Sequence, residues 1–194
     1  MSKTIFLNKM SLNIYLGPMF AGKSGMIVRI VNRYKSINKK VCIVSHVIDV
    51  RYFKENYITC HDMLKLPCER WASLMEFTKD SAFINSPIIL VDEAQFFDDL
   101  VDFVKLSTDV LGKEVYLFGL DGDTERKPFG QLLDCIPLAD SVTKLKSFCK
   151  LCNDGTEASF TFCKKEKTTQ VCIGDAEMYM PLCRKHYTTA VKGH

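Results

Sequence analysis

The fold is decided by the stretch LNIYLGPMFAGKS, residues Leu12–Ser24. It starts with a short apolar run typical of a buried strand, and its end fits the pattern G-x-x-x-x-G-K-[ST]. From Lys23 to about Tyr34, apolar residues recur at helical spacing. Between a strand and a helix, the backbone amides of such a loop face the phosphates of a nucleotide. We therefore predict a phosphate-binding loop made of Gly17, Pro18, Met19, Phe20, Ala21, Gly22, Lys23 and Ser24.

Three further apolar runs, residues 41–44, 88–91 and 115–118, are short, continuous and rich in β-branched or aromatic residues. Such runs are typical of parallel strands covered on both faces, with the ligand at their carboxyl ends. The sequence thus predicts an α/β fold, a P-loop NTPase-like parallel sheet flanked by helices, over residues 1–144. After that the pattern changes to short segments and paired cysteines, which predicts a small C-terminal subdomain over residues 145–194.

The composition is that of an ordinary globular protein, with 47% hydrophobic and 25% charged residues. The net charge of +3 is too balanced to indicate a dedicated nucleic-acid or membrane binder. No run approaches the roughly 18 apolar residues of a membrane span, and the apolar stretch at the start of the chain is too short for a secretory signal. We therefore expect a cytoplasmic chain whose nine cysteines are reduced thiols.

Two acids, Asp92 and Glu93, end the apolar run 88–91. An aspartate at the end of a buried strand near a phosphate loop is the usual Mg²⁺ partner, together with the loop serine, Ser24. Glu93 lies one residue further, where a carboxylate can take a proton from water, as in an ATPase, or from a substrate hydroxyl, as in a kinase. Asp98 and Asp99 are competing acids, although both fit the first turn of the next helix better.

Two short metal-ligand motifs lie near the C-terminal end, Cys149-x-x-Cys152 and Cys183-x-x-His186. Three thiolates and one imidazole form a closed tetrahedral set, which predicts a structural zinc. A redox role for the first pair is the alternative, but it leaves the second pair unexplained. Cys163 lies between the two motifs and is a competing ligand. The other cysteines are predicted to be small buried hydrophobic residues: Cys42, Cys60, Cys68, Cys135 and Cys172.

A polar, basic loop follows the last apolar run, over residues 119–130. At the carboxyl edge of the sheet it would line a substrate pocket, with Arg126 and Lys127 near phosphate charge and Phe129 against a flat ring. The alternative is an ordinary surface loop whose Phe129 is buried in the core.

Together these motifs resemble the type II, cytosolic, thymidine kinases, from about Leu12 to Tyr187. The resemblance rests on the glycine loop, the segment Asp92–Phe97, the loop to Gly130 and the cysteine motifs, in that order. It implies transfer of the γ-phosphoryl of ATP to the 5′-hydroxyl of thymidine, and of deoxyuridine, in nucleotide salvage. It also implies a homo-oligomer, often a tetramer, and inhibition by the end-product triphosphate.

The resemblance also implies roles for single residues. Glu93 would be the general base, and Lys23 and Arg51 would steady the transferring phosphate. The cofactor-binding set would add Asp49, Arg51, Asp92 and Gln95 to the glycine loop. The nucleoside would be bound by Met19, Phe96, Leu120, Thr124, Phe129, Thr161, Val171, Cys172, Ile173, Gly174 and Tyr179.

In this family a lid loop held by the zinc motifs closes over the thymine and excludes water, and here it would run from about Ala158 to Tyr179. The chain departs from the family pattern at three positions. Thr124 replaces a usual aromatic residue, Asp175 a common second glycine, and His186 a frequent fourth cysteine.

Two rival functions stay open at this point. One is a kinase of another deoxynucleoside, because a base pocket lined by backbone groups contains few side chains from which the preferred base could be inferred. The other is a zinc-containing, nucleic-acid-dependent ATPase. The near-neutral charge and the lack of an aromatic-basic stripe argue against it.

Overall fold

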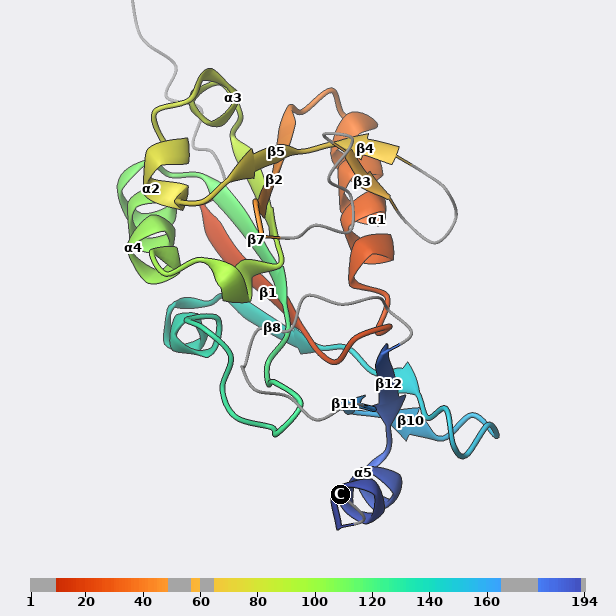
Figure 1. Cartoon of the computed structure of the whole chain (residues 1–194). Coiled ribbons are helices and arrows are strands. Elements are labelled where there is room, and N and C mark those ends of the chain that lie inside the picture. Colours follow the sequence, from red (N-terminus) through yellow and green to blue (C-terminus); the bar gives the residue numbers. More distant parts are fainter. Residues whose placement is uncertain (1–9, 49–56, 60–64, 165–177, 193–194) are drawn as a thin grey trace, which may run out of the picture.

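A six-stranded sheet forms the centre of the molecule, as seen in a computed structural model that describes residues 10–48, 57–59, 65–164 and 178–192 (Figure 1). Its strand order is β5-β2-β6-β7-β1-β8, and every neighbouring pair is parallel. The strands are β1 Ser11–Leu16, β2 Val41–His46, β5 Glu69–Trp71, β6 Ile88–Asp92, β7 Glu114–Gly119 and β8 Ser141–Lys144. The four apolar runs are thus confirmed as β1, β2, β6 and β7.

Helices cover both faces of this sheet, as predicted (Figure 1). On one face lies α1 (Lys23–Lys35), and on the other lie α2 (Leu74–Phe77), α3 (Ser81–Ile84) and α4 (Leu100–Lys105). The continuous apolar run of β6 contributes side chains to two apolar clusters, one on each face of the sheet, because successive side chains of a strand point to opposite faces. Ile88 and Leu90 pack in the cluster that contains the buried face of α1, whereas Ile89 and Val91 pack in the cluster that contains the buried residues of α2, α3 and α4.

The helix expected to start at Asp98 and Asp99 is confirmed, with two differences. Its α-helical part begins at Leu100, and from Leu106 to Val110 it widens to the π-helical turn η3. The amide of Leu111 donates to the carbonyl of Leu106 at 2.9 Å, which is the i→i−5 bond of such a turn.

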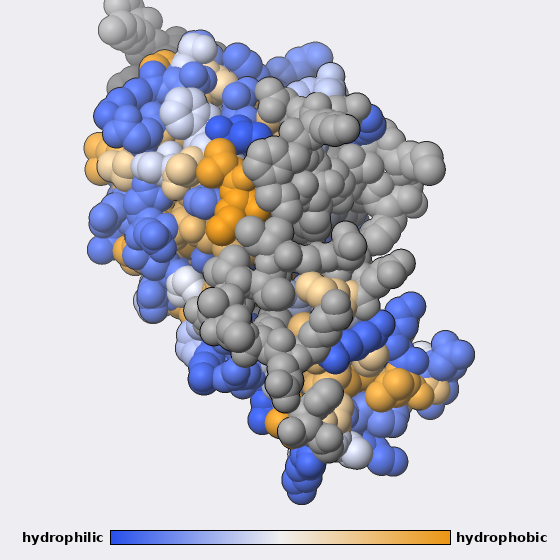
Figure 2. All heavy atoms as spheres, viewed as in Figure 1, coloured by the Kyte–Doolittle hydropathy of each residue, from blue (hydrophilic) through white to orange (hydrophobic). Residues whose placement is uncertain are grey.

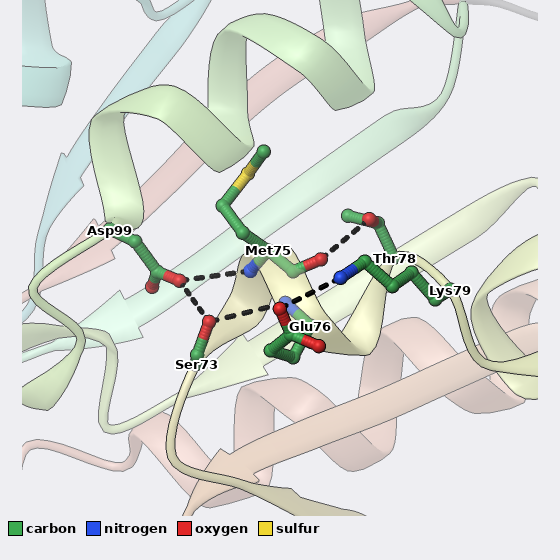
Figure 3. A network of polar contacts seen from close by, with 6 residues as sticks. All are labelled: Ser73, Met75, Glu76, Thr78, Lys79 and Asp99. Carbon is green, nitrogen blue, oxygen red and sulfur yellow. Dashed lines mark hydrogen bonds and ion pairs between the residues drawn. The ribbon is translucent and has the colours of Figure 1, made fainter.

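Asp99 precedes α4, but its carboxylate caps a different helix (Figure 3). It accepts hydrogen bonds from the Ser73 hydroxyl at 2.6 Å, the Met75 amide at 2.9 Å and the Leu74 amide at 3.1 Å, all at the start of α2. Partial burial opposes ionisation, but these hydrogen bonds outweigh it and lower the pKa of Asp99. Asp99 thus connects α2 to α4: it lies directly before α4 rather than in its first turn, and its carboxylate caps the start of α2.

The remaining elements are short. Strands β3 (Tyr57–Thr59) and β4 (Lys65–Pro67) form an antiparallel pair, η2 (Ala94–Phe96) and η4 (Leu133–Leu138) are 3-10 helices, and α5 spans Arg184–Lys192. After β8, two antiparallel pairs join β9 to β10 and β11 to β12; these strands are Ser147–Phe148, Glu157–Ala158, Phe160–Cys163 and Tyr179–Leu182. With α5 they enclose an apolar cluster of their own, which includes Ala158, Leu182 and Tyr187.

On the face seen in Figure 2, hydrophilic side chains cover most of the described surface, and apolar ones occupy separate areas. Among the helices in the described part of the chain, none has the length and apolarity that a bilayer span requires.

Candidate active site and metal centre

The ends of four strands bring the predicted phosphate-binding and acidic residues to one edge of the sheet. Leu16 of β1 is in register with Gly119 of β7 and with Lys144 of β8, and Ser45 of β2 is in register with Asp92 of β6. Strand β7 lies between β1 and β6, so the glycine loop and Asp92 are two strand spacings apart, roughly 10 Å. The apolar run 115–118 predicted this strand, but the sequence did not indicate that it lies between β1 and β6.

The glycine loop leaves β1 and enters α1 within a few residues. Gly17 passes so close to the chain after β8 that a Cβ at this position would lie 2.4 Å from the carbonyl oxygen of Leu145. Gly22 has φ of +82° and is the last residue before α1, so the amino end of that helix faces the loop. Lys23 Nζ donates to the carbonyls of Gly17 at 3.1 Å and Pro18 at 2.8 Å. The lysine therefore lies across the loop that is expected to hold phosphate.

The two acids differ in their surroundings. Asp92 is buried at the end of β6, while Glu93 is half-buried and adopts a left-handed backbone conformation, with φ 51° and ψ 43°. That conformation turns the chain sharply out of the sheet into η2. Glu93 Oε2 accepts a hydrogen bond from Gln95 Nε2 at 2.6 Å, and Gln95 Oε1 accepts one from the Leu120 amide at 3.1 Å.

The predicted pocket residues come together in two groups. Phe96 and Phe129 meet edge to face, with ring centroids 5.5 Å apart, and Phe129 is buried. Phe129 is thus buried, as the second interpretation of this loop expected, and its contact with a substrate ring stays a prediction. Met19 contacts the C-terminal segment, because its amide donates to Thr161 Oγ1 at 3.0 Å. Tyr179 pairs with Cys163 in the β11–β12 ladder that contains Thr161.

Several predicted residues lie outside the described part of the chain: Asp49, Arg51, Cys60, Val171, Cys172, Ile173, Gly174 and Asp175. Most of the expected lid, residues 165–177, lies outside it as well.

The four predicted zinc ligands converge. Their ligand atoms all lie within 4.8 Å of one another, and Cys152 Sγ is 3.8 Å from Cys183 Sγ. His186 Nδ1 lies 3.4 Å from Cys149 Sγ, 3.3 Å from Cys152 Sγ and 3.5 Å from Cys183 Sγ. A tetrahedron with Zn–S of about 2.3 Å and Zn–N of about 2.0 Å has edges of about 3.8 and 3.5 Å, so the donor set fits zinc. Cys163 is not among these four, which removes it as a competing ligand.

Electrostatics around the cluster favour a thiolate at Cys149 and oppose one at Cys152. Desolvation acts against charge on Cys149, but hydrogen bonds from the backbone of Cys183 and Cys152 and from His186 lower the pKa of its thiol to about 6. Desolvation, together with the adjacent Cys149 and Cys183 thiols, raises the pKa of Cys152 to about 11. The cysteines away from the cluster behave differently. Burial raises the thiol pKa of Cys42 and Cys135 to about 12 and also raises that of Cys68, as expected for buried hydrophobic residues.

Sequence reasoning missed a link between the metal centre and the loop after β7. The hydroxyl of Tyr187, next to His186, donates to the carbonyl oxygen of Thr124 at 2.6 Å. The Arg126 guanidinium lies 4.7 Å from the Tyr187 ring centroid, so Arg126 stacks on an aromatic ring rather than occupying the phosphate-facing position expected from the sequence. Lys127 likewise forms an exposed ion pair with Glu125 at 2.6 Å. The sequence could not have indicated this contact, because a single tyrosine next to a predicted zinc ligand forms no recognisable motif.

Comparison with known proteins agrees with the geometry. The sequence profile of the thymidine kinase family matches residues 10–187. Thymidine kinase a of Arabidopsis thaliana is 42% identical over 182 residues, which cover 92% of this chain and 75% of the plant protein. A thymidine kinase of Oryza sativa subsp. japonica is 43% identical over 91% of this chain and 65% of its own length. One from Choristoneura fumiferana entomopoxvirus is 35% identical over 92% of this chain and 96% of its own. The chain therefore belongs to the thymidine kinase family, the ATP-dependent enzymes that phosphorylate thymidine.

Proposed function

We propose that this chain transfers the γ-phosphoryl of ATP to the 5′-hydroxyl of thymidine, and of deoxyuridine, at the carboxyl edge of its sheet. One observation carries the assignment of the site: the glycine loop with Lys23 and the acidic pair Asp92 and Glu93 leave parallel strands at the same edge. A phosphoryl donor and a proton acceptor are needed on the two sides of one in-line displacement, and this edge offers both.

The donor side would be the P-loop. Its amides and the amino end of α1 would surround the phosphates, and Lys23 would exchange the carbonyl oxygens of Gly17 and Pro18 for charged phosphate oxygens. Ser24 and Asp92 offer the hard oxygen ligands that Mg²⁺ prefers, and bound Mg²⁺ would neutralise charge on the phosphates. By family resemblance, Asp49 and Arg51 belong to this side.

The acceptor side would be built around Glu93. As the 5′-oxygen forms its bond to the γ-phosphorus, the bond from phosphorus to the bridging oxygen of ADP breaks, and the hydroxyl proton passes to the Glu93 carboxylate. The pair Phe96 and Phe129 would form one wall of the base pocket. The other proposed nucleoside contacts are Met19, Leu120, Thr124, Thr161, Val171 to Gly174 and Tyr179.

The C-terminal segment would serve as a second, zinc-stabilised subdomain over residues 145–194, after the P-loop domain of residues 1–144. Its separate apolar cluster and its four converging ligands support this division. Zinc would fix the two ends of the lid, which would exclude water from the γ-phosphate. A cytoplasmic location, a homotetramer and feedback by the end-product triphosphate complete the proposal, all by family resemblance.

The test is a nucleoside panel. The purified protein is incubated with Mg-ATP and thymidine, deoxyuridine, deoxycytidine or deoxyadenosine, with and without DNA, alongside Glu93→Gln. We expect monophosphate from thymidine and deoxyuridine and a kcat in the variant lower by about 100-fold or more. Since one methyl group in a pocket is worth about 1–3 kcal/mol, thymidine should be preferred over deoxyuridine by about tenfold or more.

Glu76→Gln is the matched control, because it makes the same chemical change in an exposed ion pair with Lys79. It should retain wild-type activity. Preferred phosphorylation of another deoxynucleoside would overturn the substrate assignment, and DNA-stimulated ATP hydrolysis without a nucleotide product would overturn the kinase assignment.

A further inference from the structure

The side chain of Gln95 joins the proposed base to the end of the neighbouring strand. Its amide nitrogen lies 2.6 Å from Glu93 Oε2, and its amide oxygen lies 3.1 Å from the nitrogen of Leu120, directly after β7. A backbone N–H can only donate, so the amide oxygen must face Leu120 and the amide N–H must face Glu93. The reversed amide would place oxygen against oxygen and donor against donor. The end of β7 therefore fixes the direction of this side chain.

Two glycines make room for Gln95. A Cβ on Gly119 would lie 2.5 Å from Gln95 Oε1 and 2.8 Å from Leu132 Cδ2. A Cβ on Gly130 would lie only 2.0 Å from the backbone oxygen of Gln95, and Gly130 also has φ of +57°. Side chain and backbone of residue 95 are thus enclosed by the two ends of the loop after β7. At 3% exposure, Gln95 has little freedom to adopt another position.

Glu93 needs such a support. Its left-handed backbone conformation costs a non-glycine residue about 1–2 kcal/mol, and conformations of this kind persist where the surroundings impose them. A hydrogen bond to Oε2 fixes the rotation of the carboxylate plane, and with it the direction of both oxygens. A misplacement of about 1 Å in a reacting group can reduce the rate by about 100-fold.

We infer that Gln95 is a positioning residue, which orients the Glu93 carboxylate for the acceptor hydroxyl through an amide anchored on the backbone of Leu120. The inference rests on the proposed function, in which Glu93 accepts the hydroxyl proton. It gives Gln95 a task that does not depend on a contact with the nucleotide.

The decisive variant is Gln95→Glu, because it keeps the size of the side chain and the oxygen that Leu120 requires. It replaces the donor to Glu93 by a second carboxylate oxygen. When the carboxyl groups at positions 93 and 95 hold one proton between them, the group at position 95 can still donate a hydrogen bond to Glu93. When both groups are ionised, they repel each other. We therefore expect kcat to be lower than wild type by about 100-fold at pH 8.5 and to recover to within about tenfold at pH 6. KM for ATP and thymidine should change by less than about threefold.

Two further variants separate positioning from a loss of structure. Gln95→Met cannot donate to Glu93 at any pH, so its kcat should be reduced by the same factor across the pH range. Gln131→Glu is the matched control. Its amide also spans two groups, accepting from the Val101 amide at 3.0 Å and donating to the Asp98 carbonyl at 2.5 Å. Its pH profile should run parallel to that of the wild type. Melting temperatures identify any variant that fails to fold.

The outcomes distinguish this inference from the proposed function. A Glu93→Gln variant with wild-type kcat would remove the proposed base. An inactive Glu93→Gln variant combined with a Gln95→Glu profile parallel to wild type would overturn the positioning role alone. A Gln95→Glu effect confined to KM for ATP would overturn it as well, since the side chain would then contact the nucleotide.

Discussion

Replacing Tyr187 by phenylalanine tests whether the segment with the four candidate metal ligands fixes the conformation of the loop after β7. Tyr187 is 2% exposed and follows the metal-ligand candidate His186 on α5. Its hydroxyl donates to the carbonyl oxygen of Thr124 in the loop at 2.6 Å. Phenylalanine removes this hydrogen bond but keeps the ring that packs against Arg126 and Phe160.

The expected size of the effect follows from that one bond. A hydrogen bond contributes a net 0.5–1.5 kcal/mol or so, and an acceptor left buried without a partner costs more. Thr124 as a whole is half-buried, so the lower part of this range, a loss of about 1 kcal/mol, is expected. For a chain of this size, that lowers the melting temperature by about 2–4 °C. If the same loop conformation is needed to hold thymidine, its KM rises by up to about fivefold, while kcat and the KM for ATP stay unchanged.

The matched control is Tyr34→Phe, which removes a hydroxyl 2.8 Å from the Tyr116 hydroxyl. Tyr116 in turn donates to Glu114 at the amino end of β7, far from the glycine loop. This variant should lose stability by a similar amount without a change in the KM for thymidine. The two melting temperatures and the steady-state kinetics of both variants check the expectation. Equal thymidine KM values in the two variants would refute the coupling between the segment with the candidate metal ligands and the proposed pocket.

Three further predictions concern the metal, the loop and the helix cap. Elemental analysis should find about one zinc per chain in the wild type and much less in Cys183→Ser, while Cys163→Ser, at a buried cysteine outside the cluster, should keep the metal. Gly130→Ala should lower both the melting temperature and kcat because its Cβ would meet Gln95, whereas Gly112→Ala, with φ of +63° and nothing within 4 Å, should lower only the melting temperature. Asp99→Asn should reduce the free energy of unfolding at pH 7 by about 1.5–3 kcal/mol. Because hydrogen bonds lower the pKa of Asp99 in the folded state, its contribution is complete above about pH 4, and the difference from wild type should shrink as the pH falls further in thermal melts.

The inner strands could be predicted because each is buried on both faces. Strands β2, β6 and β7 therefore contain continuous apolar runs, β1 contains one interrupted only by Asn13, and the glycine loop marks where β1 ends. The edge strands β5 and β8 could not be predicted in this way. All four residues of β8 are exposed, so its sequence SVTK carries no apolar run.

The metal centre was predictable in part for a similarly local reason. Within each motif, two intervening residues bring both ligands onto one turn of the chain, so each pair was evident from its spacing. The two pairs were predicted to form one four-ligand site, and their convergence confirms this, but Cys163 stayed a competing ligand. The structure excludes it because β11 directs Cys163 into a buried position away from the four converging ligand atoms.

The sequence by itself determined the glycine loop between strand and helix, the acidic strand end, the parallel sheet and the two pairs of candidate metal ligands, since each depends on residues a few positions apart. Only the tertiary structure decided that β7 separates β1 from β6, that Gln95 connects Glu93 to Leu120, and that Tyr187 holds Thr124. The last two residues are 63 positions apart in the chain, and no local periodicity relates them. Such contacts arise from how finished elements pack against one another, and so they appear only once the chain has folded.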